Sequence, residues 1–298
     1  MSSSWLRAWT LVLAGVWLIA LSGCSPRQMI IGGVADSLAA QGQAAETDLE
    51  LAREASAFYL KLSEALLREQ PGHTGLAETT VAGFTQYAYA FVAFEADQRE
   101  ATDLQAATAL RQRAARLYRR AYGHGRAALT RHTPGLFESL TGAGMPPPLD
   151  PAQVGLAYWT AAAWGGSIAL STDSPEAVAD LPAAARLARL AWAADPDWGH
   201  GSLTSLLATF EGARPGGQAA QARAWHDQAI AQSAGRTAGP LVAKAEAVAL
   251  PAGDRTLFEA LLRQALAIEP VADQPQALAN EVMRRRAAWL LGQADDLF

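Results

Sequence analysis

Residues 104–121 read LQAATALRQRAARLYRRA, and apolar side chains recur in this stretch at the three- and four-residue spacing of one helix face. Residues 51–66 and 84–95 show the same spacing, and no alternating β-branched run of strand length competes with any of them. Alanine, leucine, arginine, glutamate and glutamine, all good helix formers, dominate the chain. We therefore predict an all-α fold. The apolar positions of the first stretch are Leu104, Ala107, Leu110, Ala114, Leu117 and Ala121, and the second begins with Leu51, Ala55 and Phe58.

Helix boundaries are also marked. Asp150 and Ser174 each precede a proline, and Asp254 precedes an apolar periodic segment, so all three are expected to be N-caps. Residues 141–148 read TGAGMPPP, which cannot continue a helix and predicts a loop at 141–151. We expect this loop to lie within a single helical domain that covers residues 34–298.

A weak internal repeat refines the fold prediction. Residues 189–196 read RLAWAADP and residues 263–270 read RQALAIEP, and a related helix at 225–230 lies midway between them. Small alanines where helices touch, with a proline after the second helix, are typical of tetratricopeptide-like hairpins. The alternative is a generic helical bundle with coincidental alanines. Because the three copies are nearly evenly spaced along the chain, the sequence favours divergent tetratricopeptide-like helical hairpin repeats, an α-solenoid.

The N-terminal segment indicates export. Residues 21–24 read LSGC, after an apolar run that begins near Leu11 and a single positive charge at Arg7. This arrangement resembles the lipobox of bacterial lipoproteins, in which the cysteine is acylated, for example with palmitate, and becomes the first residue. It predicts a signal peptide at 1–23, lipidation of Cys24 and a tether at 24–33. An ordinary secretory signal or a membrane-spanning helix are the alternatives. In the lipoproteins that it resembles, Ser25 after the cysteine favours the outer membrane.

Composition excludes several classes of function. The chain carries 24 basic and 29 acidic side chains, so its formal charge is −5, and this predicts no nucleic-acid partner. Half of the residues are hydrophobic, which argues against disorder. Cys24 is the only cysteine, so its acylation would leave no thiol nucleophile.

Catalytic motifs are not found in the sequence. The histidines show no metal-ligand spacing, and no nucleophile elbow, phosphate loop or dinucleotide fingerprint occurs. We therefore expect no catalytic residue, no metal, no cofactor and no enzymatic activity. Each histidine is expected at a helix end or on the surface, with the Gly-His-Gly triplets at 123–125 and 199–201 in turns. The histidines are His73, His124, His132, His200 and His226.

The segment 154–167 is unusually aromatic. It places Tyr158, Trp159 and Trp164 among alanines and glycines, and Trp198 follows in the next segment. Large rings beside small residues suit either tight packing or an apolar ligand cleft, and core packing is the more common outcome.

These segments, taken in order, resemble the T component associated with TRAP (tripartite ATP-independent periplasmic) transporters. Residues 158–165, YWTAAAWG, are similar to that family's Tyr-Trp-x-Ala-x-Ala-Trp-Gly helix. The resemblance is strongest after residue 150. Further similar segments are ADLP at 179–182, GHG at 199–201, RPGG at 214–217, ARAWHDQAI at 222–230, DRTLF at 254–258, LANEV at 278–282, RAAWLL at 286–291 and the terminal DLF at 296–298.

The resemblance implies a lipid-anchored helical protein of the periplasm that works beside a TRAP solute-binding protein and its membrane permease. It further implies a homotrimer that docks the solute-binding protein and passes it a small ligand. The lining expected for such a ligand or partner is Tyr158, Trp159, Trp164 and Trp198. The alternative function is a helical-repeat scaffold lipoprotein of envelope assembly that binds no small molecule.

Overall fold

The computed structural model describes residues 35–38, 46–142, 144–271 and 274–298. Within these ranges the regular structure is entirely helical, which confirms the predicted all-α class. None of the described helices is long and apolar enough to cross a membrane. The predicted signal peptide at 1–23, the acylated Cys24 and the tether at 24–33 lie outside the described residues.

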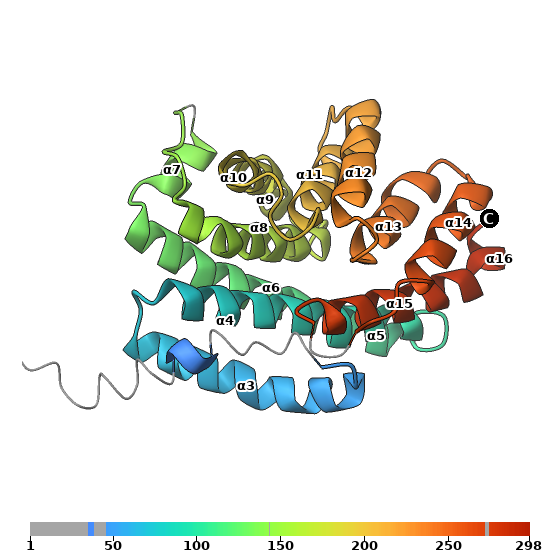
Figure 1. Cartoon of the computed structure of the whole chain (residues 1–298), viewed down its shortest axis with the longest axis horizontal. Helices are drawn as coiled ribbons and strands as arrows, with labels where there is room; N and C mark the ends of the chain where they lie inside the picture. The colour runs from blue at the N-terminus through green and yellow to red at the C-terminus, as the bar shows by residue number, and fades with distance from the viewer. Residues whose placement is uncertain (1–34, 39–45, 143, 272–273) are drawn as a thin grey trace, which may run out of the picture.

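The first half of the chain forms long helices. After α3, helix α4 continues through a π-helical segment, η1, into α5, and α6 then runs back along them (Figure 1). Their bounds are α3 Leu49–Glu69, α4 Thr74–Tyr87, η1 Ala88–Ala93, α5 Phe94–Arg99, α6 Leu104–His132 and α7 Leu136–Thr141.

The second half is built of shorter helices that lie over α6 and then turn away toward the C-terminus (Figure 1). Their bounds are η2 Pro151–Gln153, α8 Val154–Ala169, α9 Pro175–Ala179, α10 Leu181–Ala194, α11 Ser202–Ala213, α12 Ala219–Ser233, α13 Gly239–Lys244, η3 Ala245–Ala249, α14 Arg255–Leu266, α15 Ala277–Gly292 and α16 Ala294–Leu297.

The predicted N-caps are confirmed. The Asp150 side chain accepts from the Ala152 amide at 2.8 Å, and the Asp254 side chain accepts from the Leu257 amide at 2.9 Å. The Ser174 hydroxyl caps α9 in the same way. These bonds satisfy amide groups that the first turn of a helix leaves free. The predicted loop begins after α7, and no helix occurs in its described residues between Thr141 and Pro151.

One large hydrophobic core joins the two halves. It extends from Leu60 on α3 to Phe210 on α11, and a second cluster joins α13, α14 and α15. Sequences related by the predicted repeat fall on α10, α12 and α14, and the tetratricopeptide-like arrangement itself stays a prediction.

The C-terminal helices return to the first half. Figure 1 shows α15 lying beside α5, and there Arg286 pairs with Asp97 at 3.0 Å and with Glu246 at 2.6 Å. Both π-helical segments take part, because Glu246 belongs to η3 and the Arg286 guanidinium lies over the Tyr89 ring of η1. This contact ties the C-terminal helix α15 to η1 and α5 in the first half of the chain.

The apolar stripe of residues 51–66 does form a helix, but part of it faces solvent. Leu51 is 53% exposed and Phe58 is 73% exposed, whereas Leu60 and Leu67 make the core contacts. The buried face of the helix is therefore offset from its apolar stripe. Small polar residues such as Ser56 and Ser63 fit on the buried face, because their hydroxyls bond backbone carbonyls of their own helix.

Candidate functional site

Three of the four aromatic residues predicted at the site come together. Tyr158 and Trp159 lie on α8, and Trp198 lies in the turn between α10 and α11. The Tyr158 ring is 4.5 Å from the Trp198 ring and 4.8 Å from the Trp159 ring, centroid to centroid. All three side chains are half-buried: they pack against the main core and leave part of their aromatic surface exposed.

The turn before α11 brings Trp198 back onto α8. Gly199, His200 and Gly201 all have positive φ angles, of 65°, 52° and 89°. A side chain on Gly201 would also meet the Ala229 carbonyl oxygen at 2.3 Å. The predicted turn at 199–201 is thus confirmed, and glycine is needed there for both reasons.

The Tyr158 side chain is an uncharged part of the aromatic cluster. Burial raises the pKa of Tyr158 to about 12, and a hydrogen bond with the Ser202 side chain offsets only part of that rise. Its hydroxyl therefore stays protonated and can donate or accept a hydrogen bond.

An acidic side chain that the sequence analysis missed lies beside this cluster. Glu78 extends from α4 over Gly155 of α8, where a Cβ on residue 155 would lie 2.1 Å from the Glu78 Oε1 atom. No described residue gives the Glu78 carboxylate a hydrogen bond or a salt bridge. Burial raises the pKa of Glu78, as expected for a carboxylate without a cation.

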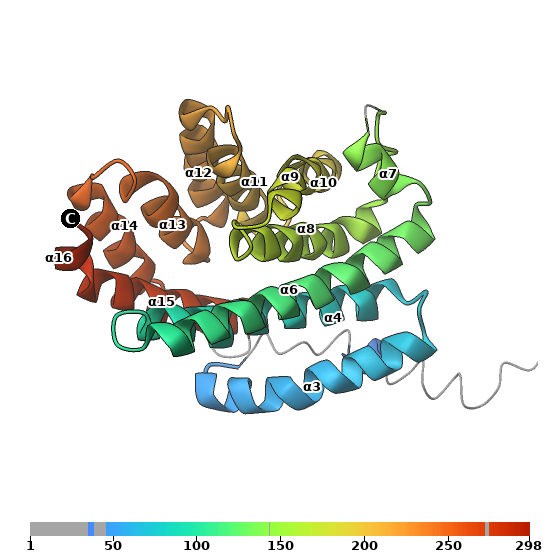
Figure 2. The same ribbon diagram turned by 180° about the vertical axis from the view of Figure 1, so that it is seen from behind.

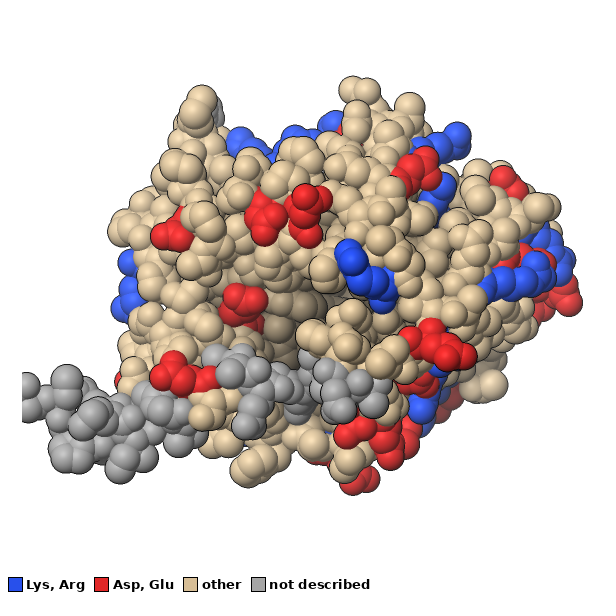
Figure 3. Space-filling view, in the orientation of Figure 1, with Lys and Arg blue, Asp and Glu red and all other residues tan. Residues whose placement is uncertain are grey.

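Helix geometry places Glu78 and the aromatic rings on the same side of α8. Gly155, Trp159 and Ala162 follow the i, i+4, i+7 spacing of one face, with Tyr158 next to them. Figure 3 shows a hollow between α4 and α8 with an acidic side chain at its rim. The arrangement combines an apolar aromatic surface with one polar group, which are the two elements of a small-molecule site.

Trp164 lies elsewhere. It is only 4% exposed, its ring stacks on Tyr122 at 4.6 Å, and its Nε1 donates to Asp180 at 3.2 Å. Five residues after Trp159, it is rotated by about 140° around α8. The five-residue spacing was therefore a signal that the two tryptophans could not share one face.

The histidine predictions need two corrections. His124 lies in the middle of α6 and bonds Glu64 at 2.9 Å, so residues 123–125 form no turn. Gly125 is required for a different reason, because a Cβ there would meet the Thr160 hydroxyl of α8 at 2.0 Å. His226 is fully buried in α12 rather than exposed.

His226 is also unusual in its chemistry. Neither ring nitrogen has a hydrogen-bond partner in the part of the chain that the structure describes. Burial, followed by the nearby Lys244 charge, lowers the pKa of His226 to about 4. Across the described residues no group of three His, Cys, Asp or Glu side chains could hold a metal ion.

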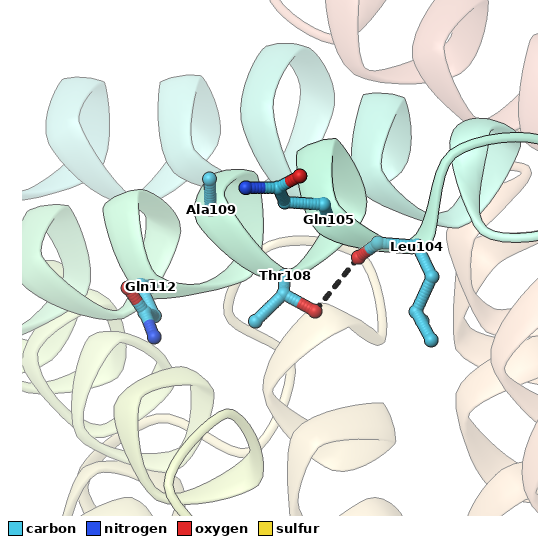
Figure 4. A pocket seen from close by; sticks show the side chains of 5 residues that line it. All are labelled: Leu104, Gln105, Thr108, Ala109 and Gln112. Carbon is cyan, nitrogen blue, oxygen red and sulfur yellow. Dashed lines mark hydrogen bonds between the residues drawn. The ribbon is translucent and has the colours of Figure 1, made fainter.

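A second, shallow depression lies on the outer face of α6. Figure 4 shows that its lining comes from one helix, and that the Thr108 hydroxyl bonds the Leu104 carbonyl of that same helix, at 2.8 Å. It presents no convergent polar groups and so has none of the features of the α4–α8 hollow. Its lining residues are Leu104, Gln105, Thr108, Ala109 and Gln112.

Comparison with known proteins agrees with the resemblance seen in the sequence. A family model described as the TRAP transporter T-component matches residues 45–298. An uncharacterized protein of Treponema pallidum (strain Nichols) is 25% identical over 263 residues, which cover 85% of this chain and 81% of that protein. The family is one of accessory components of TRAP transport on the periplasmic side. Because the family model covers most of its length, the chain belongs to the TRAP transporter T-component family.

Proposed function

We propose that this T component is a periplasmic subunit anchored through acylated Cys24, by preference to the outer membrane, that docks a TRAP solute-binding protein and passes it a small ligand. In this proposal the protein acts as a homotrimer. Family membership supports the link to TRAP transport. The lipobox-like residues 21–24 support the anchor.

The observation that carries the ligand part of the proposal is the pairing of a half-buried aromatic cluster with an unpartnered carboxylate. Tyr158, Trp159 and Trp198 offer apolar ring surface, and Glu78 adds a single acceptor. A ligand that fits this pair has an apolar body and one hydrogen-bond donor, either a protonated amine or a hydroxyl. Trp164 is left out of the proposed lining because its ring is packed in the core.

Native mass spectrometry of the protein, extracted from its membrane in mild detergent, tests the docking and oligomer parts. We expect a homotrimer that carries an extracytoplasmic solute-binding protein. Recovery of envelope-assembly proteins without any solute-binding protein would contradict the proposal and support the scaffold alternative.

A matched pair of tryptophan variants tests the lining. Trp159→Ala should weaken binding of the ligand or of the solute-binding protein while the thermal unfolding midpoint changes little. Trp164→Ala should instead lower the free energy of unfolding by about 3–5 kcal/mol, as removal of a buried aromatic ring does. If Trp159→Ala unfolds the protein as severely as Trp164→Ala does, Trp159 is a core residue and the site lies elsewhere.

A further inference from the structure

Helix α6 has an unusual charge. Its 29 residues contain seven arginines and no aspartate or glutamate. The whole chain has 24 basic and 29 acidic side chains, so the residues outside α6 carry 17 basic against the same 29 acidic groups. The acidic net charge of the chain therefore conceals one strongly basic helix.

Most of these arginines have no carboxylate partner among the described residues. Arg111 pairs with Glu100 at 2.6 Å, and Arg120 pairs with Glu64. The others are exposed. Neutral groups contact some of them: Arg119 donates to the Ser171 hydroxyl at 3.4 Å, and Arg131 to the Pro71 carbonyl at 3.1 Å. The five arginines without a carboxylate partner, here called the arginine face, are Arg113, Arg116, Arg119, Arg126 and Arg131.

The arginine face points away from the core. At 100° per residue, its members fall within an arc of about 140° on the side of α6 opposite the buried residues, and they extend over about 27 Å of helix. In Figure 2, which views the molecule from behind, α6 faces the viewer and no described helix covers it. The face is therefore a set of solvent-facing guanidinium groups spread along the helix.

Charge and shape together indicate the partner. A protein interface usually contains buried aromatic or aliphatic anchors, but the only large exposed apolar side chain on described α6 is Leu104 at its first turn. A layer of phospholipid phosphates needs no such anchor, and guanidinium groups bind phosphates in bidentate fashion. Large stacking platforms for a single-stranded nucleic acid are missing too, since none of the exposed residues on α6 is a phenylalanine, tyrosine or tryptophan.

The start of the described chain lies at the same end of the molecule as the C-terminal end of α6. Residues 35–38 lie against α3 and the residue before α4, on the side of these helices away from α6 (Figures 1 and 2), with bonds of 2.9 Å from Tyr59 to the Leu38 carbonyl and between His73 and Asp36. His132, the last residue of α6, bonds Thr74 at this same end, at 3.1 Å.

We propose that the arginine face binds the anionic phospholipid headgroups of the membrane that holds the protein, so that α6 lies on that surface. The inference rests on the proposed acyl anchor, which brings the helix within reach of the membrane. Two attachments, a lipid and a basic surface, would fix the orientation of the subunit as well as its location.

The test places one fluorescent label on the face of the acylated, full-length mature protein. Gln112 is exposed between the arginines, and Gln112→Cys provides the only free thiol if Cys24 is acylated. The protein is reconstituted into vesicles that carry a quencher at the headgroup level, made either of phosphatidylcholine alone or with added phosphatidylglycerol. A label at Gln221, exposed on α12, is the matched control.

We expect the Gln112 label to be quenched on the anionic vesicles, weakly on the neutral ones, and less at high salt. Each surface arginine strengthens contact with an anionic membrane about fivefold, so loss of three should weaken it roughly a hundredfold. A control variant that removes three exposed arginines elsewhere should keep the quenching. The test variant is Arg113→Gln, Arg116→Gln and Arg119→Gln; the control is Arg223→Gln, Arg255→Gln and Arg263→Gln.

Three results would overturn the inference: no quenching on anionic vesicles, equal quenching in the test variant, or protection of the label only when the co-extracted solute-binding protein is added. The last would assign the face to an acidic protein. The mass of the same sample distinguishes a failure of the proposed acyl anchor from a failure of the proposed membrane contact of α6. A mass without acyl chains refutes the proposed anchor, whereas an acylated protein with an unquenched label refutes only the role of α6.

Discussion

Two helix–helix interfaces of this molecule, here called seams, each contain one carboxylate, and the two carboxylates differ in whether the protein bonds them. At the α3–α6 seam, Glu64 is only 4% exposed and is bonded by Arg120, by Lys61 at 2.7 Å and by His124 at 2.9 Å. At the α4–α8 seam, Glu78 has no such partner in the described chain. Burial raises the pKa of Glu64, but its three hydrogen bonds outweigh burial and lower the pKa to about 2, while the pKa of Glu78 is raised.

The difference separates a structural group from an available one. Glu64 joins α3 to α6 through Arg120 and His124, and both of its oxygen atoms are hydrogen-bonded within the protein. Glu78 occupies a partly desolvated position without compensation, an arrangement that costs stability and is typical of binding sites. The aromatic cluster on α8 adjoins the second seam, which is why we place the ligand there.

The largest expected effect is a loss of stability in acid caused by His226. This histidine must be replaced before the acid sensitivities due to Glu64 and Glu78 can be compared. Its pKa is about 4 in the folded protein against 6.5 in an ordinary histidine, so the unfolded chain binds the proton first as the pH falls. We expect the free energy of unfolding to drop by about 3 kcal/mol between pH 6.5 and pH 4. Denaturant unfolding as a function of pH measures this loss, and His226→Met should abolish most of it. An unchanged slope in His226→Met would show that another group is responsible.

Glu64→Gln should destabilise the protein by about 2 kcal/mol at neutral pH. A buried, paired carboxylate is lost, but its cationic partners are partly exposed and can be solvated by water. Because the folded-state pKa of Glu64 is depressed, this stabilisation is present above the ordinary pKa of 4.5 and is lost as the pH falls toward 2. In a His226→Met background, the loss of stability below pH 4.5 should therefore shrink when Glu64→Gln is added. Equal acid sensitivity with and without Glu64 would contradict the assignment.

Glu78→Met should have the opposite sign and raise the free energy of unfolding by up to about 1 kcal/mol, since an unpaired carboxylate is replaced by an apolar side chain of similar length. With a raised folded-state pKa, Glu78 reduces stability as the pH rises above its ordinary value of 4.5, and the variant should remove that decline. Urea unfolding at pH 5 and pH 8 measures both. A loss of stability like that in Glu64→Gln would make Glu78 a structural group.

The smallest effect is expected on the outer face of α3. Phe58→Ala should change the free energy of unfolding by less than about 0.5 kcal/mol, because the ring is 73% exposed and contributes little to the core. Glu64→Gln, on the inner side of the same helix, is its control. A large loss in the purified protein would indicate that Phe58 is covered by a second copy of the chain.

Local features of this fold could be predicted from the sequence, and contacts between distant segments could not. Helix periodicity and the caps at Asp150, Ser174 and Asp254 depend on neighbouring residues and were confirmed. The triplet at 123–125 was misread as a turn, because its glycine permits α6 to approach α8, a contact 35 residues away in the chain.

The candidate site divides in the same way. Tyr158 and Trp159 are adjacent in sequence, so their proximity could be foreseen, and the turn at 199–201 brings Trp198 to them. Glu78 has no local signal, since its position depends on how α4 packs against Gly155. The basic face of α6 was missed for another reason: net composition averages it against acidic side chains elsewhere.

The most direct test of the central claim, that the α4–α8 seam holds a ligand and the α3–α6 seam does not, is the mass of small molecules that stay bound to the purified protein. Native mass spectra would be recorded for the wild type, Glu78→Met, Trp159→Ala and Phe58→Ala. We predict a small-molecule adduct on the wild type and on Phe58→Ala that is lost from Glu78→Met and from Trp159→Ala. An adduct retained equally by all four proteins, or missing from the wild type, would contradict the account.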